Sequence, residues 1–216
     1  TDYDRAINTG LKSAEAYYER GYAKKKMLND TGALHDENKA IELDPGNVQA
    51  YYVRALALSG LKQYDQALTD LNKTISRMPD FSEAYYMRGI VKGKLQNDTG
   101  AINDANTAIS LNPDFADAWY NRGVIKSRLK HDSDALNDFN KAILLKPDFA
   151  AAFFNRATSY ASLRDHDAAI RDYSKVLAIE PDFIQAYYNR GLEKSIIKDD
   201  SGAIADYDKV IASDPN

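Results

Sequence analysis

The chain has 216 residues, 44% of them hydrophobic, and a formal net charge of −4. This length allows one or two ordinary domains or one repeat array, and the acidic balance gives no general attraction for nucleic-acid phosphate. No apolar run approaches the roughly 18 residues of a membrane helix. Cysteine is absent, which excludes disulfides, thiolate metal sites and cysteine nucleophiles and fits a cytoplasmic location.

The first residues of the chain resemble a segment close to its end. Residues 2–7 read DYDRAI and residues 206–211 read DYDKVI. If the chain is built from two-helix units, residues 1–11 are therefore predicted to be the end of the second helix of a unit whose first helix is missing. The chain also stops without a polar capping helix, which solenoids usually need, so end-to-end self-association is one expectation.

Proline then recurs with a single period along the chain. The six prolines are Pro45, Pro79, Pro113, Pro147, Pro181 and Pro215, and every interval is 34 residues. Because proline interrupts helix interiors, each one closes a unit, and each unit needs two helices to fill its length. We predict one continuous all-α domain with repeats at residues 14–47, 48–81, 82–115, 116–149, 150–183 and 184–216.

Small and aromatic residues repeat with the same period. One alanine column comprises Ala16, Ala50, Ala84, Ala118, Ala152 and Ala186, and a second comprises Ala33, Ala67, Ala101, Ala135, Ala169 and Ala203. An aromatic residue follows each member of the first column, and Gly or Ala lies four residues beyond it, on the same helical face. These columns predict two helices that approach closely.

This pattern at a 34-residue period resembles the tetratricopeptide repeat over residues 14–216. The resemblance implies a right-handed superhelical solenoid of antiparallel helix pairs. It also implies a protein or peptide ligand in the concave groove, without nucleic acid, membrane insertion or cofactor. Chaperone-binding members use a carboxylate clamp of Lys and Asn on groove columns that here hold Tyr18 and Tyr22, so that subtype is not expected.

Two charged columns predict ion pairs between repeats. Every first helix carries one arginine and every second helix one aspartate, and a helical wheel places them on flanks facing neighbouring repeats. The predicted pairs are Asp36–Arg54, Asp70–Arg88, Asp104–Arg122, Asp138–Arg156 and Asp172–Arg190, with Asp2–Arg20 as the sixth. Six arginines lining a ligand site are the less favoured alternative.

A lysine column covaries with an aspartate column six residues later. Lysine is present only where that aspartate is, and the other two repeats have Leu58 with Tyr64 and Tyr160 with His166. This predicts salt bridges across the turn in repeats 1, 3, 4 and 6, and apolar contacts in repeats 2 and 5. The predicted pairs are Lys24–Asp30, Lys92–Asp98, Lys126–Asp132 and Lys194–Asp200.

The remaining flank of the first helices is the candidate peptide site. Its central column is Tyr18, Tyr52, Tyr86, Tyr120, Phe154 and Tyr188. Aromatic rings with a polar tip suit binding surfaces, although these rings could equally pack along the superhelix. Beside them Asn121, Asn155 and Asn189 resemble an asparagine ladder that holds a peptide backbone, because Asn offers one acceptor and two donors. A solvated polar face is the alternative.

Groove charge is mixed, so the sign of the ligand's charge stays open. Acidic Glu15, Glu83 and Asp117 lie on one side, and basic Lys26, Lys94 and Arg128 lie on the other. Lys94 and Arg128 are included among the candidate peptide-binding residues.

No constellation predicts catalysis or metal binding. The three histidines lie at different repeat positions without metal-ligand spacing, and His166 is expected to pack. Glu37 departs from an apolar column and Glu193 departs from a column of small or aliphatic residues, and either local loosening or a polar contact could follow. The sequence thus predicts a non-enzymatic scaffold; a self-associating structural module and a regulatory arm of a larger enzyme are the alternatives.

Overall fold

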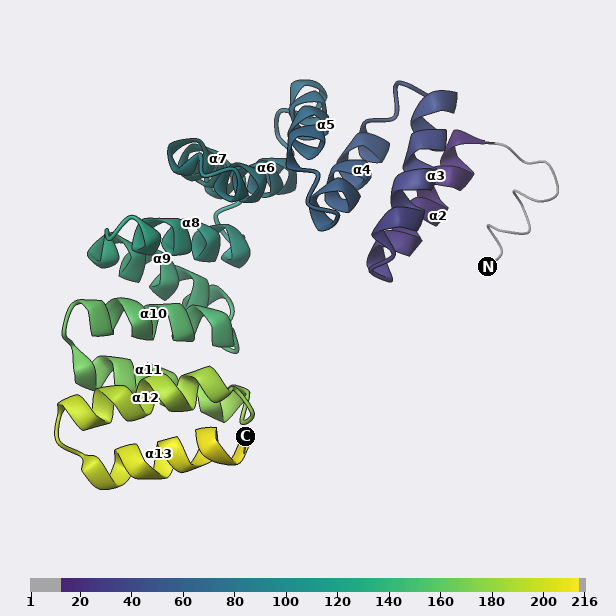
Figure 1. The fold of residues 1–216 in the computed structure, drawn as a ribbon. Coiled ribbons are helices and arrows are strands. Elements are labelled where there is room, and N and C mark those ends of the chain that lie inside the picture. Colours follow the sequence, from purple (N-terminus) through teal and green to yellow (C-terminus); the bar gives the residue numbers. More distant parts are fainter. Residues whose placement is uncertain (1–12, 214–216) are drawn as a thin grey trace. The chain divides into compact units, whose positions relative to one another are not determined.

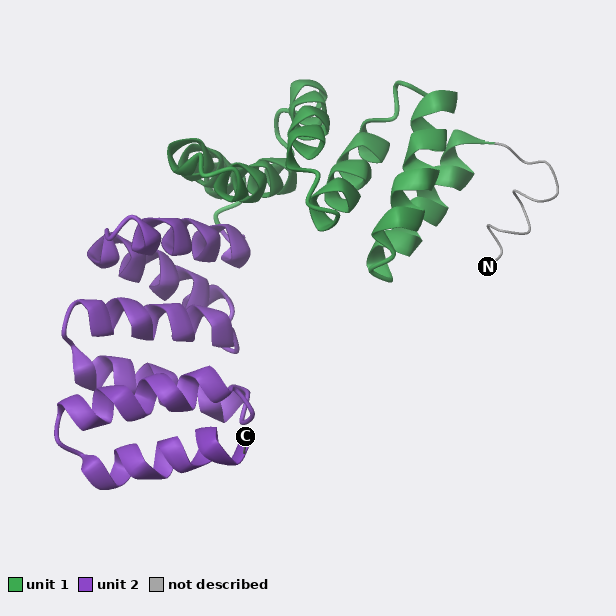
Figure 2. Ribbon diagram, in the orientation of Figure 1, with its two compact units in different colours: residues 1–113 green, residues 114–216 purple. Residues whose placement is uncertain are grey.

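The structure is a computed structural model that describes residues 13–213 (Figure 1), and in that range all regular secondary structure is α-helical. The prediction of an all-α array of helical hairpins is therefore confirmed. The predicted helix end at residues 1–11 lies outside the described residues, as does Pro215. Two compact units, residues 1–113 and 114–216, divide the chain (Figure 2), and each is considered by itself.

Unit 1 contains three hairpins. The first helices are α2 (Ala14–Lys26), α4 (Val48–Gly60) and α6 (Ser82–Lys94), and the second helices are α3 (Asp30–Leu43), α5 (Tyr64–Arg77) and α7 (Asp98–Leu111).

Unit 2 repeats the arrangement. The first helices are α8 (Ala116–Arg128), α10 (Ala150–Ser162) and α12 (Ile184–Ile196), and the second helices are α9 (Asp132–Leu145), α11 (His166–Ile179) and α13 (Asp200–Ser213). In Figure 1 α8 and α10 lie side by side, and α9 packs against both.

The turn inside every hairpin contains a non-glycine residue whose backbone adopts the left-handed conformation. These residues are Leu28, Lys62, Gln96, Lys130, Arg164 and Lys198, with φ between 58° and 66°. A left-handed residue after a helix reverses the chain and lets backbone N–H groups satisfy the last carbonyls. In repeat 1, for example, the Leu28 N–H donates to the Lys25 carbonyl and the Asn29 N–H donates to the Lys24 carbonyl. The second helix therefore starts at the same position in every repeat.

The two alanine columns form the contact between the helices of each hairpin. Every member of both columns is buried, and most are fully inaccessible. In repeat 4 close approach also requires a glycine on the first helix, because a Cβ at Gly123 would lie 2.7 Å from the Phe139 ring. Larger side chains such as Leu71, Phe139 and Tyr173 fill the space beside these contacts. Each such burial contributes about 1.5–3 kcal/mol, so the core is distributed along the array.

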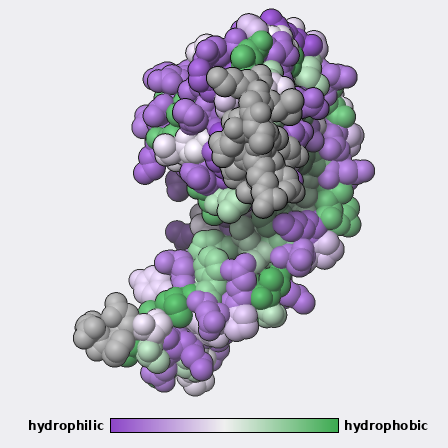
Figure 3. Space-filling model, turned by 90° about the vertical axis from the view of Figure 1, so that its right-hand side faces the viewer, coloured by the Kyte–Doolittle hydropathy of each residue, from purple (hydrophilic) through white to green (hydrophobic). Residues whose placement is uncertain are grey.

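The surface in Figure 3 shows hydrophobic residues as small patches among hydrophilic ones. Among the described residues, no helix is both long enough and apolar enough to cross a membrane.

Candidate protein-binding face and ion-pair network

The first-helix face is the surface formed by the tyrosine column, the asparagine column and the residues one and two turns beyond them. In three repeats the ring packs on the phenylalanine that ends its own repeat, directly before the next first helix. The Tyr52 ring lies 4.7 Å from Phe81, Tyr120 lies 4.7 Å from Phe149, and Phe154 lies 5.1 Å from Phe183. Burial raises the pKa of Tyr52 and of Tyr120, so both phenols remain protonated donors. Packing along the array thus accounts for much of this column.

Exposure of the ring column is greatest in the last repeat. The Tyr188 side chain is 46% exposed, and Leu192 and Ile196 follow at four-residue spacing with 44% and 51% exposed. Residues four apart lie on one helical face, so α12 presents an apolar stripe to solvent. Two neighbouring columns, one acidic and one basic, are charged in repeats 1, 3 and 4. In repeats 5 and 6 the acidic column holds Ala151 and Gln185, and the basic column holds Ser162 and Ile196. These two columns therefore carry no charge in repeats 5 and 6, and the carboxyl of Glu193, one turn beyond Asn189, is buried.

The asparagines of unit 2 are held by their own repeat and by the preceding one. The Asn155 amide donates to the Ala151 carbonyl at 2.9 Å and to the Tyr120 hydroxyl at 3.0 Å. The Asn189 amide donates to the Tyr173 hydroxyl at 3.4 Å. Both N–H groups of Asn155 are thereby occupied, and its carbonyl oxygen is the group left to accept from a ligand. The amide nitrogen of Asn121 is buried without a hydrogen-bond partner among the described residues.

The charged residues of the face are concentrated in unit 1 and in repeat 4. Glu15, Glu83, Lys26 and Lys94 are exposed, and the Lys26 ammonium lies 4.4 Å from the centre of the Tyr22 ring. In unit 2 Asp117 and Arg128 occupy the corresponding columns of α8.

The arginine and aspartate columns do form ion pairs, but the predicted partners are wrong. Arginine pairs with the aspartate of its own repeat, sixteen residues later, through Nε and Nη2 at 2.5 to 2.9 Å. The observed pairs are Arg20–Asp36, Arg54–Asp70, Arg88–Asp104, Arg122–Asp138, Arg156–Asp172 and Arg190–Asp206. This replaces the predicted Asp36–Arg54, Asp70–Arg88, Asp104–Arg122, Asp138–Arg156 and Asp172–Arg190; Asp2 lies outside the described residues. The aspartates are buried, and each bidentate pair clamps its hairpin together.

Arginine contacts the preceding repeat instead through a polar column on the second helices. The third guanidinium nitrogen of Arg54 donates to Asn38 at 2.9 Å, and that of Arg156 donates to Asn140 at 2.7 Å. Arg88 and Arg190 donate in the same way to Asn72 and Ser174 of the preceding repeats. The regular spacing of Asn38, Asn72, Asn106 and Asn140 is visible in the sequence and could have revealed this column.

The lysine column also has a different partner from the predicted one. Lys24, Lys92, Lys126 and Lys194 lie 2.8 to 2.9 Å from Asp36, Asp104, Asp138 and Asp206, the aspartates already paired with arginine. Lysine lies one helical turn after the arginine, so both reach the same carboxylate. Of the expected partners, Asp30 pairs with Lys25 at 2.8 Å, and Asp132 accepts from the Ser127 hydroxyl at 2.9 Å. The predicted apolar contact in repeat 2 is observed, since Leu58 and Tyr64 belong to one hydrophobic cluster.

The two glutamates of unusual position have different environments. Glu193 makes a polar contact, with Oε2 lying 2.6 Å from His166 Nδ1, so His166 does more than pack. Glu37 is fully buried, and neither of its oxygens has a hydrogen-bond partner in the described part of the chain. Burial, followed by the neighbouring Asp36 carboxylate, raises the pKa of Glu37 to about 9. Glu37 is therefore a neutral acid at neutral pH.

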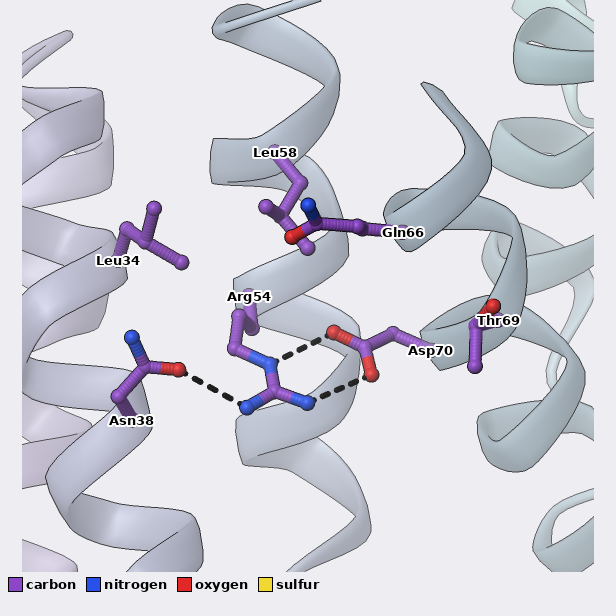
Figure 4. Close-up of a pocket in the computed structure, with 7 residues that line it drawn as sticks. All are labelled: Leu34, Asn38, Arg54, Leu58, Gln66, Thr69 and Asp70. Atoms are coloured by element: carbon purple, nitrogen blue, oxygen red, sulfur yellow. Dashed lines mark hydrogen bonds and ion pairs between the residues drawn. The ribbon is translucent and has the colours of Figure 1, made fainter. Parts of the chain in front are cut away.

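A cavity of about 290 Å³ lies in unit 1, beside the Arg54–Asp70 pair (Figure 4). Its walls are Leu34, Asn38, Arg54, Leu58, Gln66, Thr69 and Asp70, from α3, α4 and α5. Residues 13–213 contain no cluster of three or more His, Cys, Asp or Glu side chains suited to a metal ion.

The hairpins, the alanine contacts and the 34-residue period define a helical-repeat protein of the interaction-scaffold class. The tetratricopeptide repeat family matches residues 38–69, 82–115, 116–149, 150–183 and 184–216, and the chain belongs to this family. Such repeats generally act as non-catalytic protein-interaction modules.

Solved structures with this fold cover most or all of the chain. The Cut9–Hcn1 hetero-tetramer of APC/C matches with a TM-score of 0.83 and 20% identity, over 99% of this chain and 42% of that one. YrrB, described as a TPR protein with an unusual peptide-binding site, matches with a TM-score of 0.67 and 24% identity, over 88% and 98%. PilF of Pseudomonas aeruginosa matches with a TM-score of 0.83 and 16% identity, over 100% and 95%. A search of curated proteins found no match.

Proposed function

We propose that the chain is a non-enzymatic scaffold that binds an extended segment of a partner protein along the first-helix face of unit 2. The observation that carries this proposal is the hydrogen bonding of Asn155. Its two amide hydrogens are used by Ala151 and Tyr120, so its carbonyl oxygen is the group that remains to accept from a ligand. A peptide in extended conformation offers backbone N–H donors, whereas a helix has used its own.

The two columns that carry no charge in repeats 5 and 6 support a partner segment with apolar side chains there. Tyr188, Leu192 and Ile196 supply exposed apolar surface beside Asn189. Such contacts are little affected by salt, in contrast to those of a charged groove. The peptide-binding site named for YrrB belongs to that protein, and it supports this proposal by likeness of fold.

A peptide-array screen tests the proposal. The parent chain is compared with the Asn121→Ala, Asn155→Ala, Asn189→Ala triple variant after circular dichroism has shown equal helicity. Met87→Ala serves as the matched control, because Met87 occupies the same column in unit 1. We expect peptides that bind the parent and the control but not the triple variant. Peptides that bind the triple variant equally well would remove the role of the asparagines.

A further inference from the structure

Four of the six repeats place an ammonium group on the buried aspartate. In repeat 3, Asp104 Oδ2 receives both Arg88 Nε at 2.9 Å and Lys92 Nζ at 2.8 Å. Repeats 1, 4 and 6 have the same arrangement, with lysine to aspartate distances of 2.8, 2.8 and 2.9 Å. The lysine side chains are only 18% to 28% exposed, so each occupies a defined place beside its arginine.

Repeats 2 and 5 lack this lysine and differ from each other. In repeat 5 Tyr160 takes its position in the sequence, and the Tyr160 ring lies 6.0 Å from the Arg156 guanidinium carbon. In repeat 2 the shorter Leu58 takes the position, and the 290 Å³ cavity of Figure 4 lies there. A water molecule occupies about 30 Å³ in the liquid, so the cavity has room for a short alkyl chain.

The cavity retains the aspartate that the lysine uses elsewhere, and the Thr69 hydroxyl lies beside it. Asp70, with 4% of its surface exposed, receives Arg54 Nε on Oδ2 at 2.7 Å, and a carboxylate oxygen can accept a second donor. The Thr69 hydroxyl donates to the Asp65 carbonyl at 3.0 Å, which leaves its lone pairs as acceptors. Lys194 also donates to the Gly202 carbonyl at 3.3 Å, and Gln66 occupies the place of Gly202 in repeat 2.

The charge and the shape of this place both accommodate a cationic ligand. The Arg54–Asp70 pair is neutral, whereas the four lysine-containing groups each carry one net positive charge, so adding an ammonium reproduces a state that the fold already accommodates. Leu34 and Leu58 line the cavity with apolar surface suited to methylene groups. Arg54 follows Tyr52 by two residues and so projects from nearly the opposite side of α4, which separates this site from the first-helix face.

We propose that the repeat 2 cavity binds a primary ammonium group on an alkyl chain, which takes the place that lysine fills in repeats 1, 3, 4 and 6. The ammonium donates to Asp70 Oδ2, and the chain packs between Leu34 and Leu58. A lysine side chain of a partner protein and a free alkylamine share this chemistry.

The probe is n-butylamine hydrochloride, followed by two-dimensional NMR of the labelled chain, with 1-butanol as the uncharged control of equal length. We expect saturable shifts of the amides near Leu58 and Asp70 with butylamine and none with butanol. Equal shifts with both compounds would show that the cavity binds only the alkyl chain, and absent shifts would show that it binds neither; both results overturn the proposal.

Two substitutions give opposite expectations. Leu58→Lys supplies the ammonium from the chain itself and should weaken butylamine binding at least about tenfold, whereas Leu58→Met keeps a neutral side chain and should leave binding within about twofold. Lys92→Leu should create a second butylamine site beside Asp104, a gain that does not depend on the folding of the first variant. Unchanged binding in Leu58→Lys together with no new site in Lys92→Leu would contradict the proposal.

The source of the ammonium is then distinguished with Nα-acetyl-lysine N-methylamide. If this compound competes with butylamine, a lysine of a partner chain fits the site. If only the free amine binds, the peptide groups are excluded and the ligand is a free alkylamine. The asparagine variants of unit 2 should leave all these measurements unchanged, so failure of the peptide-binding proposal would not affect this one.

Discussion

His166 Nδ1 lies 2.6 Å from Glu193 Oε2, and this contact joins the first residue of α11 to α12 in the next repeat. Each residue departs from the pattern of its column: His166 replaces an acidic or aromatic residue, and Glu193 replaces a small or aliphatic one. Glu193 is 5% exposed, so the histidine is what makes its burial tolerable. Two irregularities of the repeat pattern therefore compensate each other.

Removing the histidine alone should destabilise the last two repeats. His166→Ala leaves the Glu193 carboxylate buried without this partner, which costs about 1–3 kcal/mol. Hydrogen exchange of amides in α11 and α12 measures this locally, since repeat arrays open in parts. The double variant His166→Ala, Glu193→Ala should cost less than His166→Ala alone, because the second change removes the unpaired group. Additive costs in the double-mutant cycle would contradict the coupling.

Glu37 should make the stability of repeat 1 decrease as pH rises. Its folded-state pKa of about 9 exceeds the ordinary value of 4.5, so between these values the folded state holds a proton that the unfolded state has released. The stability contribution is complete below pH 4.5 and is lost as pH rises through 9, by up to about 1.4 kcal/mol per pH unit. Burial is the main cause, and the Asp36 carboxylate adds to it.

The matched variant for this prediction is Glu37→Leu, because Leu71 occupies the same place in repeat 2 and is fully buried. We expect the variant to be more stable than the parent at pH 8 and to lose the pH dependence between 5 and 9. Hydrogen exchange of α2 and α3 amides at several pH values reports it. A parent chain whose repeat 1 is equally protected at pH 6 and pH 8 would show that Glu37 is not neutral in the folded state.

The hairpin fold could be predicted from the sequence because the proline period marks the end of each unit. The alanine columns mark the contacts between helices that follow one another in the chain. The ion-pair partners could not be read in the same way. In a strictly periodic array Asp36 has an arginine sixteen residues before it and another eighteen residues after it, and columns without variation cannot distinguish Arg20 from Arg54. The lysine partner was missed because covariation linked Lys24 to Asp30, whereas side-chain reach from α2 brings it to Asp36. The burial of Glu37 and the contact of Glu193 depend on neighbouring helices, which no column reveals.

The buried aspartates should be the most sensitive charged positions of the chain. Asp138 pairs with both Arg122 and Lys126, and its side chain is 2% exposed. Asp138→Ala leaves two cations without it and should cost about 3–5 kcal/mol. Lys39→Ala removes the exposed Lys39–Glu42 pair and should cost far less, because water screens an exposed ion pair. Urea denaturation of both variants gives the comparison, and similar costs would mean that burial adds nothing to the aspartate pairs.

Acid should weaken the ion pairs of two of these buried aspartates, Asp36 in repeat 1 and Asp206 in repeat 6. Burial opposes the ionisation of Asp36 and Asp206, but hydrogen bonds from the neighbouring arginine and lysine outweigh it and lower the pKa of both carboxyls below 3.8. A carboxyl with a lowered folded-state pKa contributes stability above its unfolded value, and this contribution is lost as pH falls through the folded value. Asp206→Asn should therefore reduce the loss of α13 protection between pH 5 and pH 2 relative to the parent, which hydrogen exchange can measure. An identical acid profile in the variant would assign acid unfolding to other carboxyls.

The asparagines that receive the third arginine nitrogen should control coupling between repeats. Asn140 on α9 accepts from Arg156 on α10 at 2.7 Å, whereas Ser174 on α11 accepts from Arg190 on α12 at 3.0 Å. Asn140→Ala removes the acceptor without touching the Arg156–Asp172 pair and should cost about 0.5–1.5 kcal/mol. Asn140→Ser should cost less, because a serine already makes this contact one repeat later. Hydrogen exchange should show that α10 separates from α9 more easily once this contact is lost. The amides of α10 and α11 should keep the same protection relative to one another. Asn137 is an exposed control position on the same helix, and its amide donates to the Ser133 carbonyl within α9. Equal destabilisation by Asn140→Ala and by Asn137→Ala would show that the arginine contact does not couple the repeats.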